Sequence, residues 1–367
     1  MVKDHHDEPY DEGTRLKLDL FADYVTSWLP VFIHTPFITN ISIYDFFSGP
    51  GCDLNGVPGS PLRIAQIVNN KFQEQLHEKD KQVAAVFNDK APKKVLSLQE
   101  RLESAQSDCF QAHVQCNEFS DAFLEHLPSM KKQGHANLVL LDPTGFHWHP
   151  EDIQRIAAIK CTDWIAFIPS NYALRFKKLE SIKKCWPKLH EESMTNKNST
   201  RVIAEHLKEE YLPTDHLVAH FGIKKSGGRS HGVLFGSNSW KGLEKFIEQC
   251  WKADPHNGAA SYELEGDIKD TGQPLLIEMP HGSKLRNFKR SFQSEILSGK
   301  IQTNKDAYEY TLKAACLPKH ASEVLSDLKK HKKIKYSDSK SPTAVKKLSM
   351  SFKAIFQDRK IQNIEIE

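Results

Sequence analysis

Residues 41–61 read ISIYDFFSGPGCDLNGVPGSP, and this stretch decides the fold. An apolar run typical of a buried β-strand ends at the acidic residue Asp45. A turn of small residues follows, with Gly49 and Gly51 two positions apart, and a helix is expected to begin near Ser60 and Pro61. A strand that ends in a carboxylate and a glycine turn is how open α/β sheets hold nucleotide-like ligands at their carboxyl edge.

Strand and helix signals alternate on both sides of this stretch. Short apolar runs predict strands at 41–47, 83–88, 112–116, 136–141 and 164–168, and helical spacing of apolar residues predicts helices at 14–29, 61–70, 93–104, 120–126 and 150–159. The segment 217–237, with Gly227 and Gly228 at its centre, predicts a β-hairpin. Five parallel strands closed by an antiparallel hairpin predict an α/β fold with the doubly wound, Rossmann-type sheet of class I methyltransferases.

A second, basic domain is expected at the C-terminus. Residues 267–283 are rich in Gly, Pro and Asp and predict a linker between a domain at 1–266 and one at 284–367. Helical patterns at 284–297, 306–315 and 319–330, followed by a short strand at 333–336, predict a winged helix. Residues 281–367 carry 19 Lys and Arg against 9 Asp and Glu, whereas residues 1–280 carry 31 against 38. This charge predicts a contact with a polyanion such as nucleic acid, and a solvated lysine-rich surface explains the charge equally well.

The composition excludes several other classes of protein. In 367 residues no apolar run reaches the ~18 residues that a membrane span needs, and the polar, acidic N-terminus is unlike a signal peptide. The seven cysteines form no CxxC pair, which argues against a zinc or iron–sulfur site and fits reduced thiols in a cytoplasmic protein. We therefore expect a cytoplasmic protein with no membrane partner.

The first candidate site is a cofactor pocket at the glycine turn. No Lys-Ser/Thr pair follows the glycines, which excludes a P-loop, and the spacing Asp-x-x-x-Gly-x-Gly favours S-adenosyl-L-methionine over a phosphate. Asp45 is expected to accept hydrogen bonds from the amino group of the methionine moiety, with Phe47, Ser48, Gly49 and Gly51 forming the wall of the pocket. A glycine turn without a ligand is the alternative.

The next two strand ends supply the rest of the expected cofactor site. Asp89 follows the second strand, where an acidic residue binds the ribose hydroxyls of a nucleoside cofactor. Asn117 or Glu118 follows the third strand and is expected near the adenine. Taken singly, Asp89 is better explained as an acidic residue that opens a turn, but three strand ends along one edge favour a joint site.

The fourth strand end, NLVLLDPTGFHWHP, predicts an acceptor site. Amino-methyltransferases that act on bases place Asp/Asn-Pro-Pro-aromatic around the exocyclic amine, with the aromatic ring stacked on the flipped base. Asp142 and Pro143 match this pattern, Thr144 and Gly145 replace its second half, and Phe146 would supply the ring one position late. A tight Asp-Pro turn is the alternative, and no metal site is expected here.

Several blocks of sequence together resemble one known family. TRLKLDLFADYVTSW, DFFSGPG…GVPGSP, LLDPTG, PSNYALR and KGLEKFIEQCWKADP are similar to the three-Cys-motif partner family over nearly the whole chain. The resemblance implies a fold like that of S-adenosylmethionine-dependent methyltransferases and a radical-enzyme-like partner that carries the three cysteines. At Thr144, family members more often have an aromatic residue.

These patterns leave two main hypotheses. The first is an S-adenosylmethionine-dependent methyltransferase that acts on a nucleobase amine in nucleic acid, with Asp142, Pro143 and Phe146 at the acceptor. The second is a non-catalytic adaptor that keeps the fold and binds a partner protein or nucleic acid; the altered Asp-Pro-Thr-Gly motif favours it. A nicotinamide-dependent enzyme is weaker because of the hairpin, and a nuclease lacks an acid-rich cluster.

Overall fold

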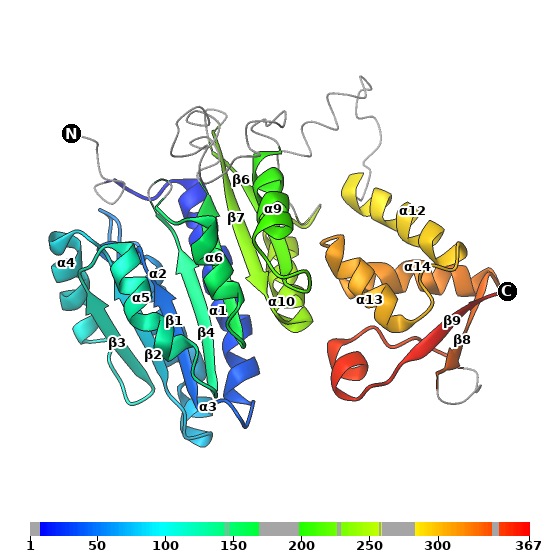
Figure 1. Cartoon of the computed structure of the whole chain (residues 1–367), viewed down its shortest axis with the longest axis horizontal. Helices are drawn as coiled ribbons and strands as arrows, with labels where there is room; N and C mark the ends of the chain where they lie inside the picture. The colour runs from blue at the N-terminus through cyan, green and yellow to red at the C-terminus, as the bar shows by residue number, and fades with distance from the viewer. Residues whose placement is uncertain are drawn as a thin grey trace. The chain divides into compact units, whose positions relative to one another are not determined.

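A seven-stranded sheet organises the N-terminal part of the chain (Figure 1). The computed structural model describes residues 8–143, 145, 147–168, 198–225, 229–256, 258, 283–339 and 345–367. Its contacts divide the chain into two units, Met1–Lys245 and Phe246–Glu367. The predicted linker at 267–283 lies outside the described residues except for its last one.

The strand order of this sheet is β3-β2-β1-β4-β5-β7-β6. Strands β1 to β5 run parallel, and β7 is antiparallel to both β5 and β6. This arrangement confirms the predicted methyltransferase-like Rossmann fold with its antiparallel hairpin. The strands are β1 (Asn40–Asp45), β2 (Val83–Asn88), β3 (Phe110–Gln115), β4 (His135–Leu141), β5 (Thr162–Ile168), β6 (Leu217–Lys225) and β7 (Arg229–Ser237).

Alternation along the strands sends side chains to two different layers. Tyr44 and Phe46 belong to a core formed with α5 (Phe119–Met130), α6 (Pro150–Ala157) and α9 (Ser199–Glu210). Ile43 and Asp45 therefore point to the opposite face, where α1 (Glu12–Ile33) and α2 (Ser60–Ile67) lie (Figure 1). The strand register places Asp45 beside Phe87 of β2 and Leu140 of β4. The acidic residue of β1 is thus buried beneath α1 and α2.

Local sequence explains where the helices begin. The carboxylate of Asp11 caps α1 by accepting the Thr14 N–H at 2.7 Å. Proline occupies the first turn of α2, of α4 (Pro92–Glu103) and of α6, where its missing N–H costs no helical hydrogen bond. A π-helical turn, η2 (Val68–Phe72), joins α2 to α3 (Gln73–Glu78), and α10 (Trp240–Ala253) follows the hairpin. Neither α3 nor α9 was predicted.

The second unit confirms the predicted winged helix. It contains α12 (Ser283–Leu297), α13 (Asn304–Lys313) and α14 (Pro318–Lys330), followed by a two-stranded antiparallel sheet of β8 (Ile334–Asp338) and β9 (Gln362–Ile366). Phe292, Tyr308 and Leu325 are buried in its core. Strand β9 was missed in the sequence, as was the single turn η5 (Lys353–Gln357) that precedes it. Among the described helices of both units, none has the length and apolar character to cross a membrane.

Candidate active site

The glycine turn after β1 needs glycine at both predicted positions. Gly49 and Gly51 adopt φ angles of 63° and 90°, a region that favours glycine. A Cβ atom on Gly51 would lie 2.8 Å from Cδ1 of Leu98 in α4. The Gly59 N–H donates to the Gly51 carbonyl at 2.8 Å and fixes the return of the chain into α2. The backbone of the turn therefore packs closely between two helices.

Asp45 holds this turn from beneath. Its carboxylate is fully buried and accepts the Ser60 hydroxyl at 2.6 Å and the Phe47 N–H at 3.2 Å. Burial raises the pKa of Asp45 to about 7, against the opposing effect of the Ser60 hydrogen bond, and the nearby Asp142 carboxylate raises it further. Both oxygens thus serve the turn and the start of α2. For Asp45 to contact a ligand amine, as predicted, one of its carboxylate oxygens would have to accept a second hydrogen bond.

Asp89 meets the glycine turn from the neighbouring strand. Its Oδ2 accepts the Gly49 N–H at 3.2 Å, and its Oδ1 accepts the Ala91 N–H at 2.9 Å. Each carboxylate oxygen has two acceptor positions, so each can still take a hydroxyl donor. The Asp89 carboxylate is partly buried, and the neighbouring glycines have no side chains that would block a ligand. Such a site suits the ribose of a nucleoside cofactor. The residues present fit such a group.

A polar side chain that the sequence analysis missed joins three strand ends. Asn88, almost fully buried, donates to the carbonyls of Phe46 and Asn117 at 3.3 and 3.0 Å and accepts the Asn117 N–H at 3.1 Å. The Asn88 carbonyl accepts the Ser48 N–H at 2.9 Å. Asn88 thereby fixes Ser48 and Asn117 beside the turn. Glu118, by contrast, is exposed and lies 3.8 Å from the Lys90 ammonium.

Aromatic rings lie next to the turn. Phe47 stacks on Phe119, the first residue of α5, with ring centroids 5.2 Å apart. The imidazole of His147, from the loop after β4, has its centroid 6.4 Å from the Phe47 ring. Phe47 is partly buried, and together with these rings it forms an apolar wall of the kind on which a planar base stacks.

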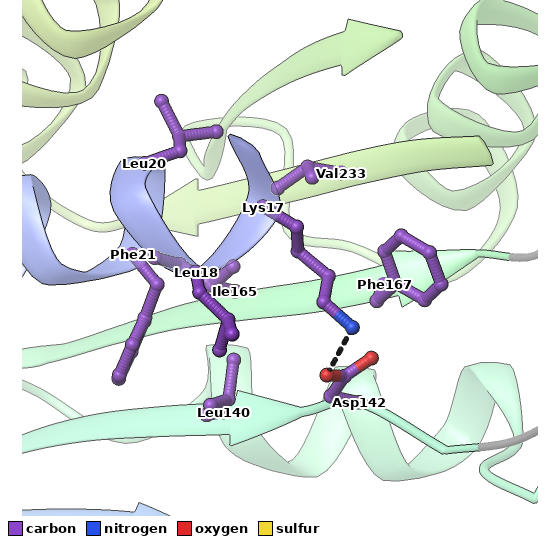
Figure 2. Close-up of a pocket in the computed structure, with 9 residues that line it drawn as sticks. All are labelled: Lys17, Leu18, Leu20, Phe21, Leu140, Asp142, Ile165, Phe167 and Val233. Carbon is purple, nitrogen blue, oxygen red and sulfur yellow. Dashed lines mark hydrogen bonds and ion pairs between the residues drawn. The ribbon is translucent and has the colours of Figure 1, made fainter. Parts of the chain in front are cut away.

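The acceptor candidate Asp142 is held by a residue that the sequence analysis did not single out. Lys17 of α1 places its Nζ 2.5 Å from Oδ2 of Asp142 and 4.2 Å from the centroid of the Phe167 ring (Figure 2). The side chains of Lys17 and Asp142 are only 17% and 19% exposed. Apolar residues surround the pair in a small pocket: Leu18, Leu20, Phe21, Leu140, Ile165 and Val233. The ammonium thus occupies one carboxylate oxygen and one aromatic face.

A signal for Lys17 was present in the sequence. Lys17, Phe21, Tyr24 and Trp28 recur at helical spacing, and the last three are buried. A lysine within an otherwise apolar stripe usually has a buried partner. The partner itself, 125 positions away in sequence, cannot be read from the pattern.

The loop after Asp142 is a tight turn. Pro143 is buried, and its carbonyl accepts the Gly145 N–H at 3.0 Å, with Gly145 at a φ of 113°. Thr144 and the stacking candidate Phe146 lie outside the described residues. Within the part of the chain that the structure describes, no group of three or more His, Cys, Asp or Glu residues is placed to hold a metal ion.

Comparison with known proteins gives one family match, to the GMT-like wHTH domain over residues 266–341. No curated protein matches the chain. Trm1 from Pyrococcus horikoshii, solved with S-adenosyl-L-methionine, is similar at 11% identity and a TM-score of 0.38; the match covers 66% of this chain and 62% of that one.

Two further solved structures have comparable similarity. The METTL16 MTase domain matches at 14% identity and a TM-score of 0.31, over 59% of this chain and 66% of that one. Cofactor-bound Rv0187 from MTB matches at 12% identity and a TM-score of 0.34, over 61% of this chain and 80% of that one.

Proposed function

We propose that this protein is an S-adenosylmethionine-dependent methyltransferase whose acceptor is a nucleobase amino group in nucleic acid. One observation carries the proposal: the Asp89 carboxylate accepts a hydrogen bond from the Gly49 N–H at 3.2 Å. Both residues lie at the carboxyl edge of a methyltransferase-like sheet. Parallel α/β sheets bind nucleoside ligands at this edge.

Each group at the edge has a role in this proposal. Asp89 would accept hydrogen bonds from the ribose hydroxyls, the backbone of Gly49 and Gly51 would hold the methionine moiety, and Asn117 or Glu118 would border the adenine. Asp45 acts mainly by holding the turn, through its hydrogen bonds to Phe47 and Ser60. The Phe47–Phe119 stack supports the apolar side of the pocket.

Asp142 and Pro143 would bind the acceptor amine, and Phe146 would stack on the base that carries it. Oδ1 of Asp142 accepts an amine N–H and turns the nitrogen lone pair toward the cofactor, while the Pro143 carbonyl takes the second N–H. When bound, the cofactor supplies an electrophilic methyl group on a sulfonium. Because Lys17 already places a cation at Asp142, a second cation would be repelled. This favours the neutral amine of a base over a lysine ammonium.

The proposed partners rest on two different kinds of support. The match to the GMT-like wHTH domain and the basic C-terminal domain support nucleic acid as the substrate. The resemblance to the three-Cys-motif partner family supports a radical-enzyme-like protein as a second partner, in the cytoplasm. That protein would supply the cysteines from which the family takes its name.

The ion pair between Lys17 and Asp142 also favours a second candidate function. A carboxylate already bound by an ammonium resembles a site closed to an acceptor. Together with the altered Asp-Pro-Thr-Gly sequence, this supports a non-catalytic adaptor that keeps the fold and binds a partner or nucleic acid.

Methyl transfer distinguishes the two candidates. The purified protein is incubated with methyl-labelled S-adenosylmethionine and bulk RNA or DNA, and the label in nucleic acid is counted. The enzyme proposal expects incorporation that Asp142→Ala lowers by about 10²-fold, the usual cost of removing a group that positions the reacting atoms. The exposed Glu151 at the start of α6 provides the control variant Glu151→Ala. No incorporation by wild-type protein that does bind the cofactor favours the adaptor.

A further inference from the structure

The winged-helix unit has a basic groove along one side of α14. The groove has a volume of about 460 Å³ and is lined by α14, by β8 and by the segment 345–350. Four of its ten lining residues are lysines and none is acidic: Ser322, Leu325, Ser326, Lys329, Lys330, Tyr336, Lys346, Lys347, Leu348 and Met350. The groove lining therefore carries positive charge and no negative charge.

Lys329 connects the elements that line the groove. Its ammonium donates to the carbonyls of Val345 and Lys346 at 3.0 and 2.7 Å and lies 4.6 Å from the Tyr336 ring centroid. The Tyr336 hydroxyl in turn donates to the Leu325 carbonyl at 2.9 Å. These contacts anchor the backbone of Val345 and Lys346 to α14, so the exposed side chains of Lys346 and Lys347 start from an anchored segment.

Three other lysines are available to a ligand. Lys330, Lys346 and Lys347 are exposed, and the ion pairs described for this unit use other cations: Lys289, Lys300, Lys305, His331 and Lys335. Ser322 and Ser326 donate their hydroxyls to helix carbonyls one turn earlier, at 2.9 and 2.7 Å. These small side chains leave room for a chain to approach the helix.

Two acidic residues of α14 lie outside the groove lining. Glu323 and Asp327 are exposed and four positions apart, with Glu323 paired to Lys289 at 2.7 Å and Asp327 near His331 at 3.4 Å. A phosphate backbone approaching these two residues would meet negative charge. The groove lining itself contains lysines and no acidic residue.

We infer that the groove between α14 and the segment 345–350 binds the phosphate backbone of nucleic acid, through Lys330, Lys346 and Lys347. This inference rests on the proposed function, because it names the surface that holds the nucleic-acid substrate. Ammonium groups contact phosphates as point charges and read no base edges. The groove therefore binds nucleic acid independently of sequence and leaves base selection to the acceptor site.

Fluorescence anisotropy of the full-length protein with a labelled RNA hairpin and a labelled DNA duplex tests this inference. Lys346→Ala/Lys347→Ala should weaken binding to both probes and lower the slope of log affinity against log salt by about 2, one for each lost phosphate contact. Lys319→Ala/Lys333→Ala removes the same charge from exposed positions outside the groove and should leave the slope nearly unchanged. Changing the probe sequence at constant length should leave the affinity within about twofold.

The outcomes separate this inference from the proposed function. If both double variants weaken nucleic-acid binding equally, the groove is not the binding site, while nucleic acid remains the proposed substrate class. Absence of binding to any nucleic acid by wild-type protein overturns both. If the protein binds polyglutamate as tightly as RNA of equal charge, the groove is not a nucleic-acid site. That result would indicate an acidic protein partner. Calorimetry with S-adenosylmethionine on each variant checks that the first unit is intact.

Discussion

Two buried carboxylates should give this protein a pH-dependent stability. Burial raises the pKa of Asp45 to about 7 and that of Asp163 to about 6, in each case against hydrogen bonds that lower it. From pH 4 upward the unfolded chain has released protons that the folded chain keeps, so the free energy of unfolding falls as the pH rises. For Asp45 the fall ends near pH 7, and for Asp163 near pH 6.

Asp45→Asn isolates the contribution of one carboxyl. A pKa change of about three units corresponds to roughly 4 kcal/mol. The stability of wild type relative to Asp45→Asn should therefore decrease by about that amount between pH 4 and pH 7, as measured by urea unfolding. With Asp163→Asn the corresponding decrease should end one pH unit earlier. A difference from wild type that is constant with pH would contradict the assignment.

The Lys17–Asp142 pair should appear as energetic coupling. Lys17→Met leaves a largely buried carboxylate without its ammonium and should cost about 1–3 kcal/mol in unfolding free energy. Asp142→Asn should cost a similar amount, and the double variant should be about 1–2 kcal/mol more stable than the sum predicts. Additive costs in a denaturant cycle would mean that the two side chains do not interact.

At the level of single residues, sequence predicts the positions at strand ends better than their partners. Asp45, Asp89 and Asp142 follow apolar runs, so their place at the carboxyl edge is predictable. That Asp45 binds Ser60, and that Asp142 binds Lys17, depends on how α1 and α2 pack on the sheet. Such packing joins segments that no local pattern connects.

At the level of elements, the glycine turn offers a test with an internal control. Gly51→Ala places a Cβ 2.8 Å from Leu98 at a φ of 90°, whereas Gly56→Ala has a similar φ, 76°, and no atom within 4 Å. Both should cost about 1–2 kcal/mol from backbone strain. Only Gly51→Ala should also displace the turn and weaken S-adenosylmethionine affinity by tenfold or more, measured by calorimetry. Equal affinities for the two variants would show that the turn does not border the cofactor.

The prediction of helices and strands was correct where the sequence pattern is local. Buried strands such as VAAVFN and NLVLL, bounded by turn residues, are recognisable from sequence alone. Strand β9, QNIEI, is short and half polar, and it becomes a strand only by pairing with β8 more than twenty positions earlier. The π-helical turn η2 likewise leaves no signal, because the residues of η2 are compatible with an ordinary helix.

For the whole molecule, the uneven charge predicts two different responses to salt. Basic residues exceed acidic ones in 281–367, while 1–280 have a net acidic balance. Raising NaCl from about 50 to about 300 mM should weaken nucleic-acid binding steeply, since each phosphate contact releases counterions. Affinity for S-adenosylmethionine should change little over the same range, because it depends on hydrogen bonds and stacking. Parallel salt titrations by anisotropy and calorimetry check this, and a salt-independent nucleic-acid affinity would contradict it.

The central claim is that the carboxyl edge of the sheet is a nucleoside cofactor pocket, and cofactor titration tests it most directly. Isothermal calorimetry with S-adenosylmethionine and S-adenosylhomocysteine should give one site per chain. Asp89→Asn should weaken both ligands by about 10- to 100-fold, the loss expected for hydrogen bonds to a charged group. The exposed Asp121 in the first turn of α5 gives the control Asp121→Asn, which should bind as wild type does. Absence of binding by wild-type protein, or an Asp89→Asn affinity equal to wild type, would contradict the account.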